Sequence, residues 1–295
     1  MHEWYAAPME GLTGWRWRQV QHEMFGGAAL YVTPFVSPNG NFSFQRKELE
    51  EMDPERNRGI PVVPQILTNR AEYFVWAAKE CRSRGWAQID LNLGCPSGTV
   101  TGKKKGAGLL RQPELLRQLL DGIFDALPDM KISVKTRIGW ERAEEWPALL
   151  ALLETYPICR LTVHPRVRTQ FYKGTADREV FRWTAEHTAL PLCYNGDVTT
   201  VLREMGEAFP DAAIMVGRGL VADPSLLRQA TGGPAASLEE LREFHDRLYG
   251  LYCRDFSGDV PVLHHMRELW NYFSRSFRET DTLLRQVRKA GVDKY

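Results

Sequence analysis

The chain has 295 residues and a formal net charge of +1, with 43% hydrophobic and 25% charged residues. This length suits one α/β barrel with a small appendage, and the composition permits an ordinary buried core. The near-zero charge excludes a uniformly basic surface, so any nucleic acid would have to be bound by a local basic patch.

The sequence lacks the features of membrane and disulfide-rich proteins. Its first residues, Met1 to Trp4, contain neither a basic nor an apolar signal region, so we expect no secretory signal peptide. No apolar run approaches the ~18 residues that a membrane span needs. The cysteines are odd in number, far apart and without a CxxC pair, which argues against a disulfide framework or a metal site and favours a reducing, cytoplasmic setting. They are Cys81, Cys95, Cys159, Cys193 and Cys253.

Short apolar, β-branched runs recur along most of the chain, and each is followed by a longer stretch with helical character. Several runs are apolar at consecutive positions, which is typical of parallel strands covered on both faces. Eight such units predict a (β/α)8 barrel, with a doubly wound open sheet as the alternative. The predicted strands span 3–7, 30–34, 61–67, 87–93, 131–136, 160–164, 190–195 and 213–217, and helical spacing is clear at 115–127 and 146–153.

The strand pattern stops after Gly232-Gly233-Pro234. Ser237 and Glu240 then fit a helix capping box, and three helices with apolar faces are predicted to follow. We therefore expect a barrel over 1–235 and a small all-helical domain over 236–295. The three faces carry Leu238, Leu241, Phe244, Leu248 and Leu251, then Leu263, Met266, Leu269, Trp270, Phe273 and Phe277, then Leu283, Leu284 and Val287, with Gly291 as the expected stop.

Polar residues follow almost every predicted strand. In an eight-fold barrel the functional residues lie at the C-terminal ends of the strands, so we expect these side chains to share one rim. Turn formation alone predicts fewer such coincidences. The strand ends hold Ala7-Pro8-Met9, Gln65, Asn92-Leu93-Gly94-Cys95-Pro96, Lys135-Thr136-Arg137, His164-Pro165-Arg166, Asn195-Gly196-Asp197 and Gly217-Arg218-Gly219.

The last two strand ends favour a phosphate site. Loops after the seventh and eighth strands commonly bind phosphate in such barrels. The glycines of Asn195-Gly196-Asp197 and Gly217-Arg218-Gly219 allow backbone N–H groups to approach an anion, and Arg218 adds a charged fork. The alternative is two ordinary glycine turns.

Three further rim residues suit a flavin. Lys135 ends an apolar strand, where its charge is costly without an anionic partner, and a reduced flavin offers one. His164 could donate to the same edge of the ring, and Gln65 could bond it from another side. The alternative for His164 and Gln65 is a satisfied polar group in the core.

Cys95 is the most specific candidate for a catalytic residue. It ends a strand and precedes Pro96 and a loop over 97–108 whose glycines we expect to let it move. A thiol there could be a proton donor or a nucleophile, although no Cys/His dyad is visible. The alternative is a buried structural cysteine, which is how we interpret Cys81, Cys159 and Cys193.

In this order, the strand-end residues resemble the tRNA-dihydrouridine synthase family. The resemblance runs through the whole barrel and into the helical region, and the Asn-x-Gly-Cys-Pro run with the later Tyr-Lys-Gly-x-Ala-Asp run is its specific part. The matching segments are Ala7-Pro8-Met9-Glu10-Gly11-Leu12-Thr13, Asp90-Leu91-Asn92-Leu93-Gly94-Cys95-Pro96, Val134-Lys135-Thr136-Arg137, Val163-His164-Pro165-Arg166, Tyr172-Lys173-Gly174-Thr175-Ala176-Asp177, Asn195-Gly196-Asp197-Val198 and Gly217-Arg218-Gly219.

The resemblance implies an FMN-dependent enzyme that uses NADPH to reduce the C5=C6 bond of selected uridines in tRNA. It implies that Cys95 protonates C5 after hydride reaches C6 from the flavin. The flavin-binding positions are Pro8, Met9, Gln65, Lys135, His164, Asn195, Gly196, Asp197, Gly217 and Arg218. The positions that would meet the target base or nearby RNA are Asn92, Arg137, Arg166 and Tyr172.

The chain departs from the family pattern at a few positions. Thr13-Gly14 replaces a usual Thr-Asp, Trp17-Arg18 replaces a Phe-Arg, His164-Pro165-Arg166-Val167 replaces a His-Gly-Arg-Thr, and Asp223 stands where an Asn is common. The cysteine, lysine and histidine are retained. The target uridine and the preference between NADPH and NADH therefore stay open.

RNA contacts are expected on two surfaces. A second domain behind the barrel mouth would bind RNA by shape and phosphate, with Arg267, Arg275, Arg278, Arg285, Arg288 and Lys289 as its basic residues. Lys103-Lys104-Lys105, Arg166 and Arg168 would add phosphate contacts, with a solvated loop as the alternative for the lysines. We expect a monomer. The competing functions are a barrel flavin reductase acting on a small molecule and a non-catalytic RNA-binding protein.

Overall fold

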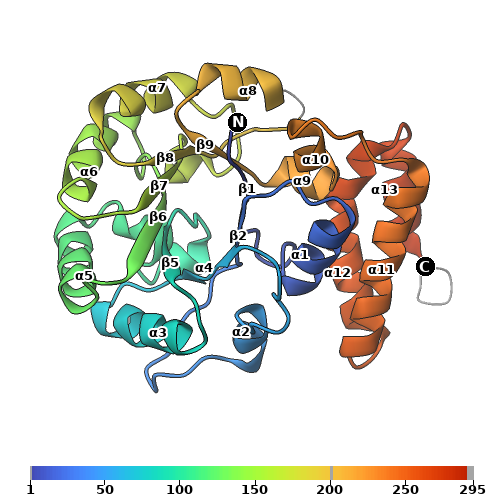
Figure 1. The fold of residues 1–295 in the computed structure, drawn as a ribbon, viewed down its shortest axis with the longest axis horizontal. Coiled ribbons are helices and arrows are strands. Elements are labelled where there is room, and N and C mark those ends of the chain that lie inside the picture. Colours follow the sequence, from blue (N-terminus) through green and yellow to red (C-terminus); the bar gives the residue numbers. More distant parts are fainter. Residues whose placement is uncertain (1, 200–201, 291–295) are drawn as a thin grey trace.

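A computed structural model describes residues 2–199 and 202–290. Its nine parallel strands form one sheet in the order β3-β2-β1-β9-β8-β7-β6-β5-β4. The two outermost strands of this order, β3 and β4, are separated in the chain only by Pro64, so the sheet closes on itself (Figure 1). This arrangement confirms the predicted barrel and is not the open sheet.

The strands lie where the apolar runs predict them. They are Trp4–Ala6 (β1), Leu30–Val32 (β2), Val62–Val63 (β3), Gln65–Ile66 (β4), Gln88–Leu93 (β5), Lys131–Arg137 (β6), Arg160–His164 (β7), Leu192–Tyr194 (β8) and Ala213–Val216 (β9). One predicted strand, 61–67, is split in two. The physical reason is Pro64, which has no N–H to donate to a ladder. β3 therefore pairs with β2, and β4 pairs with β5.

Helices cover the outside of the barrel (Figure 1). They are Trp15–Met24 (α1), Arg46–Glu51 (α2), Ala71–Ser83 (α3), Gly98–Thr101 (α4), Pro113–Ala126 (α5), Trp146–Leu153 (α6), Arg178–His187 (α7), Leu202–Ala208 (α8), Arg218–Ala222 (α9) and Leu226–Ala230 (α10). Short 3-10 turns are Gly106–Leu109 (η1), Ala143–Glu145 (η2), Arg168–Gln170 (η3) and Ser274–Ser276 (η4).

The inside of the barrel is only partly apolar. Successive side chains of a strand point to opposite faces, so Trp4 and Ala6 join the large cluster under the helices while Tyr5 and Ala7 join a second, small cluster. Val32, Cys193 and Met215 complete that small cluster. The remaining inward positions of the central strands are polar and buried. Buried polar side chains are unusual in a core, so these positions are candidates for a functional site. They include Gln65, Asp90, Asn92, Ser133, Thr162 and His164.

The C-terminal region is helical, as the sequence predicts. Leu238–Asp255 (α11), Asp259–Phe273 (α12) and Thr280–Lys289 (α13) lie on one side of the barrel, next to α1 and α9 (Figure 1). The predicted capping box is present, with the Glu240 amide donating to Ser237 Oγ at 3.1 Å and the Ser237 amide donating to Glu240 Oε2 at 2.8 Å. The expected stop at Gly291 lies outside the described residues.

The helical region shares a core with the barrel. Phe244 of α11 is fully buried, and its ring meets Trp17 of α1 edge-on, with centroids 6.3 Å apart, and Phe25 at 5.8 Å. All three belong to the same hydrophobic cluster as the barrel core. The division at residue 235 stays a prediction, because the apolar packing is continuous across it.

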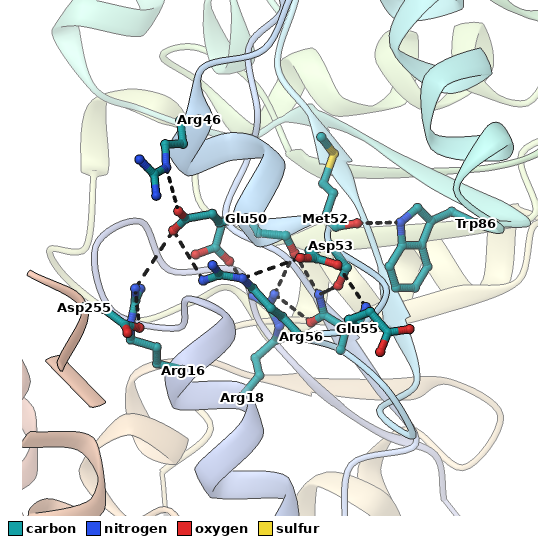
Figure 2. A network of polar contacts seen from close by, with 12 residues as sticks. Arg16, Arg18, Arg46, Glu50, Met52, Asp53, Glu55, Arg56, Trp86 and Asp255 are labelled. Atoms are coloured by element: carbon teal, nitrogen blue, oxygen red, sulfur yellow. Dashed lines mark hydrogen bonds and ion pairs between the residues drawn. The ribbon is translucent and has the colours of Figure 1, made fainter. Parts of the chain in front are cut away.

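Ion pairs reinforce this junction on the side of α2 (Figure 2). Arg16 of α1 pairs with Asp255 at the end of α11 at 2.8 Å and with Glu50 of α2 at 3.9 Å. Glu50 also pairs with Arg46 at 3.3 Å and with Arg56 at 3.4 Å. The network therefore joins α1, α2 and α11, segments far apart in the sequence.

The shared core gives a stability prediction. Replacing Phe244 by Ala should lower the free energy of unfolding by about 3–5 kcal/mol, because it opens a cavity among buried aromatic rings. Urea denaturation followed by circular dichroism measures the change. Leu238→Ala on the same helix is the matched control, since this side chain is 72% exposed and its removal should matter by under ~0.5 kcal/mol. Equal effects of the two substitutions would contradict the shared core.

Candidate active site

A cavity of about 320 Å³ opens at the C-terminal ends of the barrel strands. Every residue that the sequence predicts for the site lines it except Arg166. The predicted residues in its wall are Pro8, Met9, Gln65, Asn92, Cys95, Lys135, Arg137, His164, Tyr172, Asn195, Gly196, Asp197, Gly217 and Arg218. The barrel thus brings together side chains from most of its strands, as the rim position of these residues implies.

One wall of the cavity is basic. Lys135 and Arg137 are two residues apart on β6, so their side chains point to the same face. Arg137 pairs in register with His164 on β7. Burial, followed by the charge of Arg137, lowers the pKa of Lys135 to about 8, and burial lowers the pKa of Arg137 to about 10. Arg137 is held by two carbonyl acceptors, Gly94 O at 3.0 Å and Val167 O at 3.1 Å. Among the described residues the Lys135 ammonium has no such acceptor, so it is available to a bound group.

His164 is a neutral imidazole. Burial, and then the charges of Arg137 and Lys135, hold its pKa well below the ordinary value. Arg166 donates from Nη1 to His164 Nε2 at 3.0 Å, since a guanidinium has only donors. The ring proton is therefore assigned to Nδ1, which makes His164 a hydrogen-bond donor at that atom.

Arg166 lies beneath the cavity and does not line it. Its side chain is 1% exposed, and it also donates to Gly174 O at 2.7 Å and to Asp197 Oδ2 at 2.5 Å. The sequence places Arg166 among the substrate contacts, but its N–H groups are used inside the protein. Its position in the structure is that of a support for His164 and Asp197.

Asp197 lines the end of the cavity where the sequence predicts a phosphate, and several side chains and amides there bond to it. Its carboxylate accepts from Arg166, from Arg218 at 2.8 Å and from the Ala176 amide at 2.8 Å. Burial acts to raise its pKa, but the hydrogen bonds from Arg166 and Ala176 outweigh burial, and the pKa is lowered. The backbone φ of Asp197 is 47°, a left-handed conformation that aspartate tolerates better than most residues. Asp197 is therefore ionised and aims the Arg218 side chain.

The segment that carries Cys95 is folded. The sequence predicts a mobile loop over 97–108, but this segment forms α4 and η1 and is bound to its surroundings. The Ala107 amide donates to Cys95 O at 3.1 Å, and Arg168 donates to Pro96 O at 3.1 Å and to Thr101 Oγ1 at 3.2 Å. Gly106 has a φ of 55°, and a Cβ there would lie 3.0 Å from Cys95 O, so glycine is required for close approach.

The Cys95 thiol is half-buried and faces the cavity. Burial raises its pKa, and the nearby charge of Glu10 acts in the same direction, although Arg137 and Lys135 oppose them. A thiol with a raised pKa stays protonated at neutral pH. This state suits a proton donor and does not suit a nucleophile.

Gln65 and Asn92 are joined to each other at the base of the cavity. Asn92 donates from Nδ2 to Gln65 Oε1 at 2.7 Å, and both residues are buried. Tyr172, in contrast to these buried residues, is 52% exposed and lies at the cavity mouth. The guanidinium of Arg218 sits 4.7 Å from its ring centre and that of Arg137 5.5 Å. Tyr172 thus presents a ring over the basic wall.

Two cavity residues that the sequence analysis missed come from the helical region. Glu268 and Tyr272 of α12 line the same cavity as the barrel residues. Their spacing of four places them on one helix face, away from the buried Met266 and Leu269. That spacing is the only signal in the sequence, and it does not say which part of the barrel the face meets.

Two further kinds of feature matter for function in the parts of the chain that the structure describes. Over 2–199 and 202–290, no helix has the length and apolarity to cross a membrane. Within the same ranges, His, Cys, Asp and Glu side chains form no group of three suited to a metal ion. The five cysteines are free thiols.

Comparison with known sequences gives one family. The family model described as "Dihydrouridine synthase (Dus)" matches residues 5–294. A probable tRNA-dihydrouridine synthase of Rhizobium leguminosarum bv. phaseoli is 29% identical over 293 residues, which cover 97% of this chain and 88% of that protein. The tRNA-dihydrouridine synthase B of Proteus vulgaris is 31% identical over 263 residues, covering 83% and 80%.

Comparison with solved structures gives the same fold at low identity. The old yellow enzyme homologue from Zymomonas mobilis is similar with a TM-score of 0.55 and 10% identity, over 81% of this chain and 91% of that one. The Old Yellow Enzyme from Pichia sp. AKU4542 has a TM-score of 0.54 and 10% identity, over 81% and 86%. At this identity the likeness establishes a shared barrel fold alone.

The family match extends over the barrel, the cavity and the helical region together. It includes Cys95, the basic wall around Lys135 and the α12 residues that complete the cavity. The chain therefore belongs to the dihydrouridine synthase family.

Proposed function

We propose that this protein is a flavin-dependent tRNA-dihydrouridine synthase, which uses FMN and NADPH to reduce the C5=C6 bond of specific uridines in tRNA. The observation that carries the proposal is that the Cys95 thiol and the Lys135 ammonium, which has no acceptor among the described residues, face one cavity in a member of this family. A cytoplasmic location and a monomeric state remain predictions.

The residues of the cavity fit FMN. Lys135 offers a cation without an acceptor of its own among the described residues, and an anionic ring would supply one. At the other end, Arg218 lies beside Gly196 and Gly217. A Cβ on Gly196 would lie 2.6 Å from the Ala176 Cβ, so glycine is required there for the close packing of this rim segment. These features support a phosphate at Arg218 and a ring beside Lys135.

Cys95 would act as the general acid. FMN, when bound and reduced, supplies the hydride that the uracil C6 receives. Cys95 then gives its proton to C5, and the thiolate that results is stabilised by the charges of Lys135 and Arg137. The raised pKa keeps the thiol protonated until that step.

The substrate base would enter at the mouth of the cavity. A uridine stacked in folded tRNA has to be extracted before its C5=C6 bond can be reached. Tyr172 offers an exposed ring for stacking, and Asn92 and Arg137 lie deeper in the cavity for the polar edge of the base. Glu268 and Tyr272 close the mouth from the side of α12.

Basic residues for tRNA binding are exposed on the helical region. They are Arg275, Arg278, Arg285, Arg288 and Lys289. Lys103 and Lys104 are also exposed on the cysteine segment, whereas Lys105 donates to Ser37 Oγ at 2.9 Å. Arg168 holds the Cys95 segment, and Arg267 donates to Ala290 O at 2.9 Å, so both are engaged within the protein. The phosphate contacts are therefore assigned to the exposed group.

The role of Cys95 gives the first prediction of function. Cys95→Ala should retain bound FMN and tRNA but lower dihydrouridine formation by about 100-fold or more, because it removes the proton donor. Mass spectrometry of tRNA from a strain that lacks the enzyme, incubated with the variant, measures the product and maps its position. Cys253→Ala is the control, since that thiol is exposed and outside the cavity. Normal turnover by Cys95→Ala would rule out this acid.

Lys135 gives a pH prediction. Its pKa in the folded protein is about 8, so its charge is present below that pH and absent above it. Flavin reduction by NADPH should therefore slow as the pH rises through about 8, because the cation that favours an anionic reduced ring is removed. Anaerobic stopped-flow absorbance measures the rate. Lys135→Met should be slow at every pH and lack this limb, whereas an unchanged profile in the variant would contradict the assignment.

The exposed arginines give a prediction for tRNA. Arg285→Ala with Arg288→Ala should weaken tRNA binding and reduce the slope of log affinity against log salt by about 1 for each phosphate that the variant no longer neutralises. Filter binding across a salt series measures both. Lys79→Ala on α3 is the control for removal of a surface charge. Salt-independent tRNA binding, or its absence in the parent protein, would favour a flavin reductase of small molecules.

A further inference from the structure

We propose that Asp90 is a positioning residue that fixes the backbone at Cys95 through two intervening amide side chains. Asp90 lies on β5, two residues before Asn92, and is 2% exposed. It touches neither the cavity nor any group to which the proposed reaction gives a role in chemistry. A buried carboxylate inside a barrel is costly, so its contacts should explain its presence.

The contacts form one continuous chain of hydrogen bonds. Gln65 donates from Nε2 to Asp90 Oδ2 at 2.8 Å, and Asn92 donates from Nδ2 to Gln65 Oε1 at 2.7 Å. The Gly94 and Cys95 amides then donate to Asn92 Oδ1 at 3.0 Å and 2.9 Å. Asp90 is thus connected to the Cys95 backbone by three successive hydrogen bonds.

The direction of this hydrogen-bond chain is fixed at both ends. Backbone amides only donate, so Asn92 must turn its oxygen toward Gly94 and Cys95 and its NH2 toward Gln65. Gln65 must then present its oxygen to Asn92 and its NH2 to Asp90. A carboxyl oxygen that carries no proton only accepts, so Asp90 Oδ2 excludes the flipped form of Gln65. Without an acceptor at position 90 the hydrogen-bond chain loses the group that defines its orientation.

The hydrogen-bond chain rests on rigid elements. Gln65 of β4 and Asp90 of β5 are partners in the parallel register, and Asp90 and Asn92 point to the same face of β5 because they are two residues apart. Sites supported by strands hold their geometry more closely than sites supported by loops. Cys95 lies beyond the end of the strand, so its amide is fixed to the sheet through its hydrogen bond to Asn92.

Other neighbours keep the carboxylate in place. Ser133 donates to the second oxygen, Asp90 Oδ1, at 2.7 Å. Both oxygens therefore accept. Burial raises the pKa of Asp90, and the hydrogen bonds from Gln65 and Ser133 and the charges of Lys135 and Arg160 oppose burial. The Ser133 contact anchors Asp90 without taking part in the route to Cys95, which makes it a useful point of comparison.

The catalytic consequence rests on the proposed function, but the positioning does not. If Cys95 is the acid, its sulfur has to meet one face of the bound base, and a small displacement is costly to such a transfer. Loosening the Gly94 and Cys95 amides would let the sulfur leave that position. The same loosening can be measured on the protein alone.

The test uses the full chain without FMN, NADPH or tRNA. Asp90→Ala should accelerate hydrogen exchange of the Gly94 and Cys95 amides by about 10-fold and should change the alkylation rate of Cys95 by iodoacetamide, because the acceptor chain is broken. Nuclear magnetic resonance reports the amides, and peptide mass spectrometry reports Cys95 separately from the other thiols. Asp90→Asn keeps an oxygen for Gln65 and should stay close to the parent protein.

Ser133→Ala is the matched control, since it removes a bond to the same carboxylate but leaves the hydrogen-bond chain to Cys95 intact. Gln65→Met breaks this chain at its middle and keeps Asp90 with its bond to Ser133, and it decides the question if Asp90→Ala does not fold. Exchange and alkylation within about twofold of the parent protein in a folded Asp90→Ala or Gln65→Met variant would overturn the proposal. Equal acceleration by Ser133→Ala would also overturn it, because the effect would then be general loosening of the strand.

These outcomes are distinguishable from failure of the proposed function. Faster amide exchange in Asp90→Ala together with normal dihydrouridine formation by Cys95→Ala would leave the positioning intact and remove the acid. A dihydrouridine synthase in which Asp90→Ala changes neither exchange nor alkylation would keep the function and remove the positioning role.

Discussion

Everything in this site depends on keeping positive charge inside the mouth of a barrel. Burial, and then the charge of Arg137, lower the pKa of Lys135, and burial lowers the pKa of Arg137. Such an arrangement is unfavourable unless negative charge is close by. Asp197 supplies it at one end of the cavity, through ion pairs with Arg166 and Arg218. The remaining positive charge faces the cavity, where an anionic ligand would be bound.

The helical region takes part in the site as well as in the architecture. Phe244 of α11 packs in the same hydrophobic core as the barrel residues, and Arg16 of α1 forms an ion pair with Asp255 of α11. α12 then reaches over the rim and contributes Glu268 and Tyr272 to the cavity. The helical region and the cavity are therefore adjacent parts of one continuous packed structure, which is why the packing of α11 and α12 matters to the cavity.

Much of the barrel and its rim could be predicted from the sequence, because strand ends in a barrel meet by topology. Cys95, Lys135 and His164 follow from position alone, without knowledge of the loops between them. What could not be predicted is the direction of each side chain. Arg166 and Arg168 look like RNA-binding residues in the sequence, but buried carbonyl and carboxylate acceptors turn them inward. The ordered segment after Cys95 and the wall formed by α12 depend on long-range contacts that a local pattern does not contain.

Pro64 divides the third barrel strand into two short pieces, and each piece belongs to a different neighbour. The proline has no N–H to offer, but its carbonyl accepts the Asp90 amide at 2.8 Å. Gln65 is bonded on both sides of this break. Its amide donates to Thr33 Oγ1 at 3.0 Å and its carbonyl accepts from the Val36 amide at 2.8 Å, while its side chain donates to Asp90 of β5 at 2.8 Å. The two halves of the divided strand thus hold Gln65 between two neighbours, and the hydrogen bonds that lead to the Cys95 amide begin at a residue fixed from both sides.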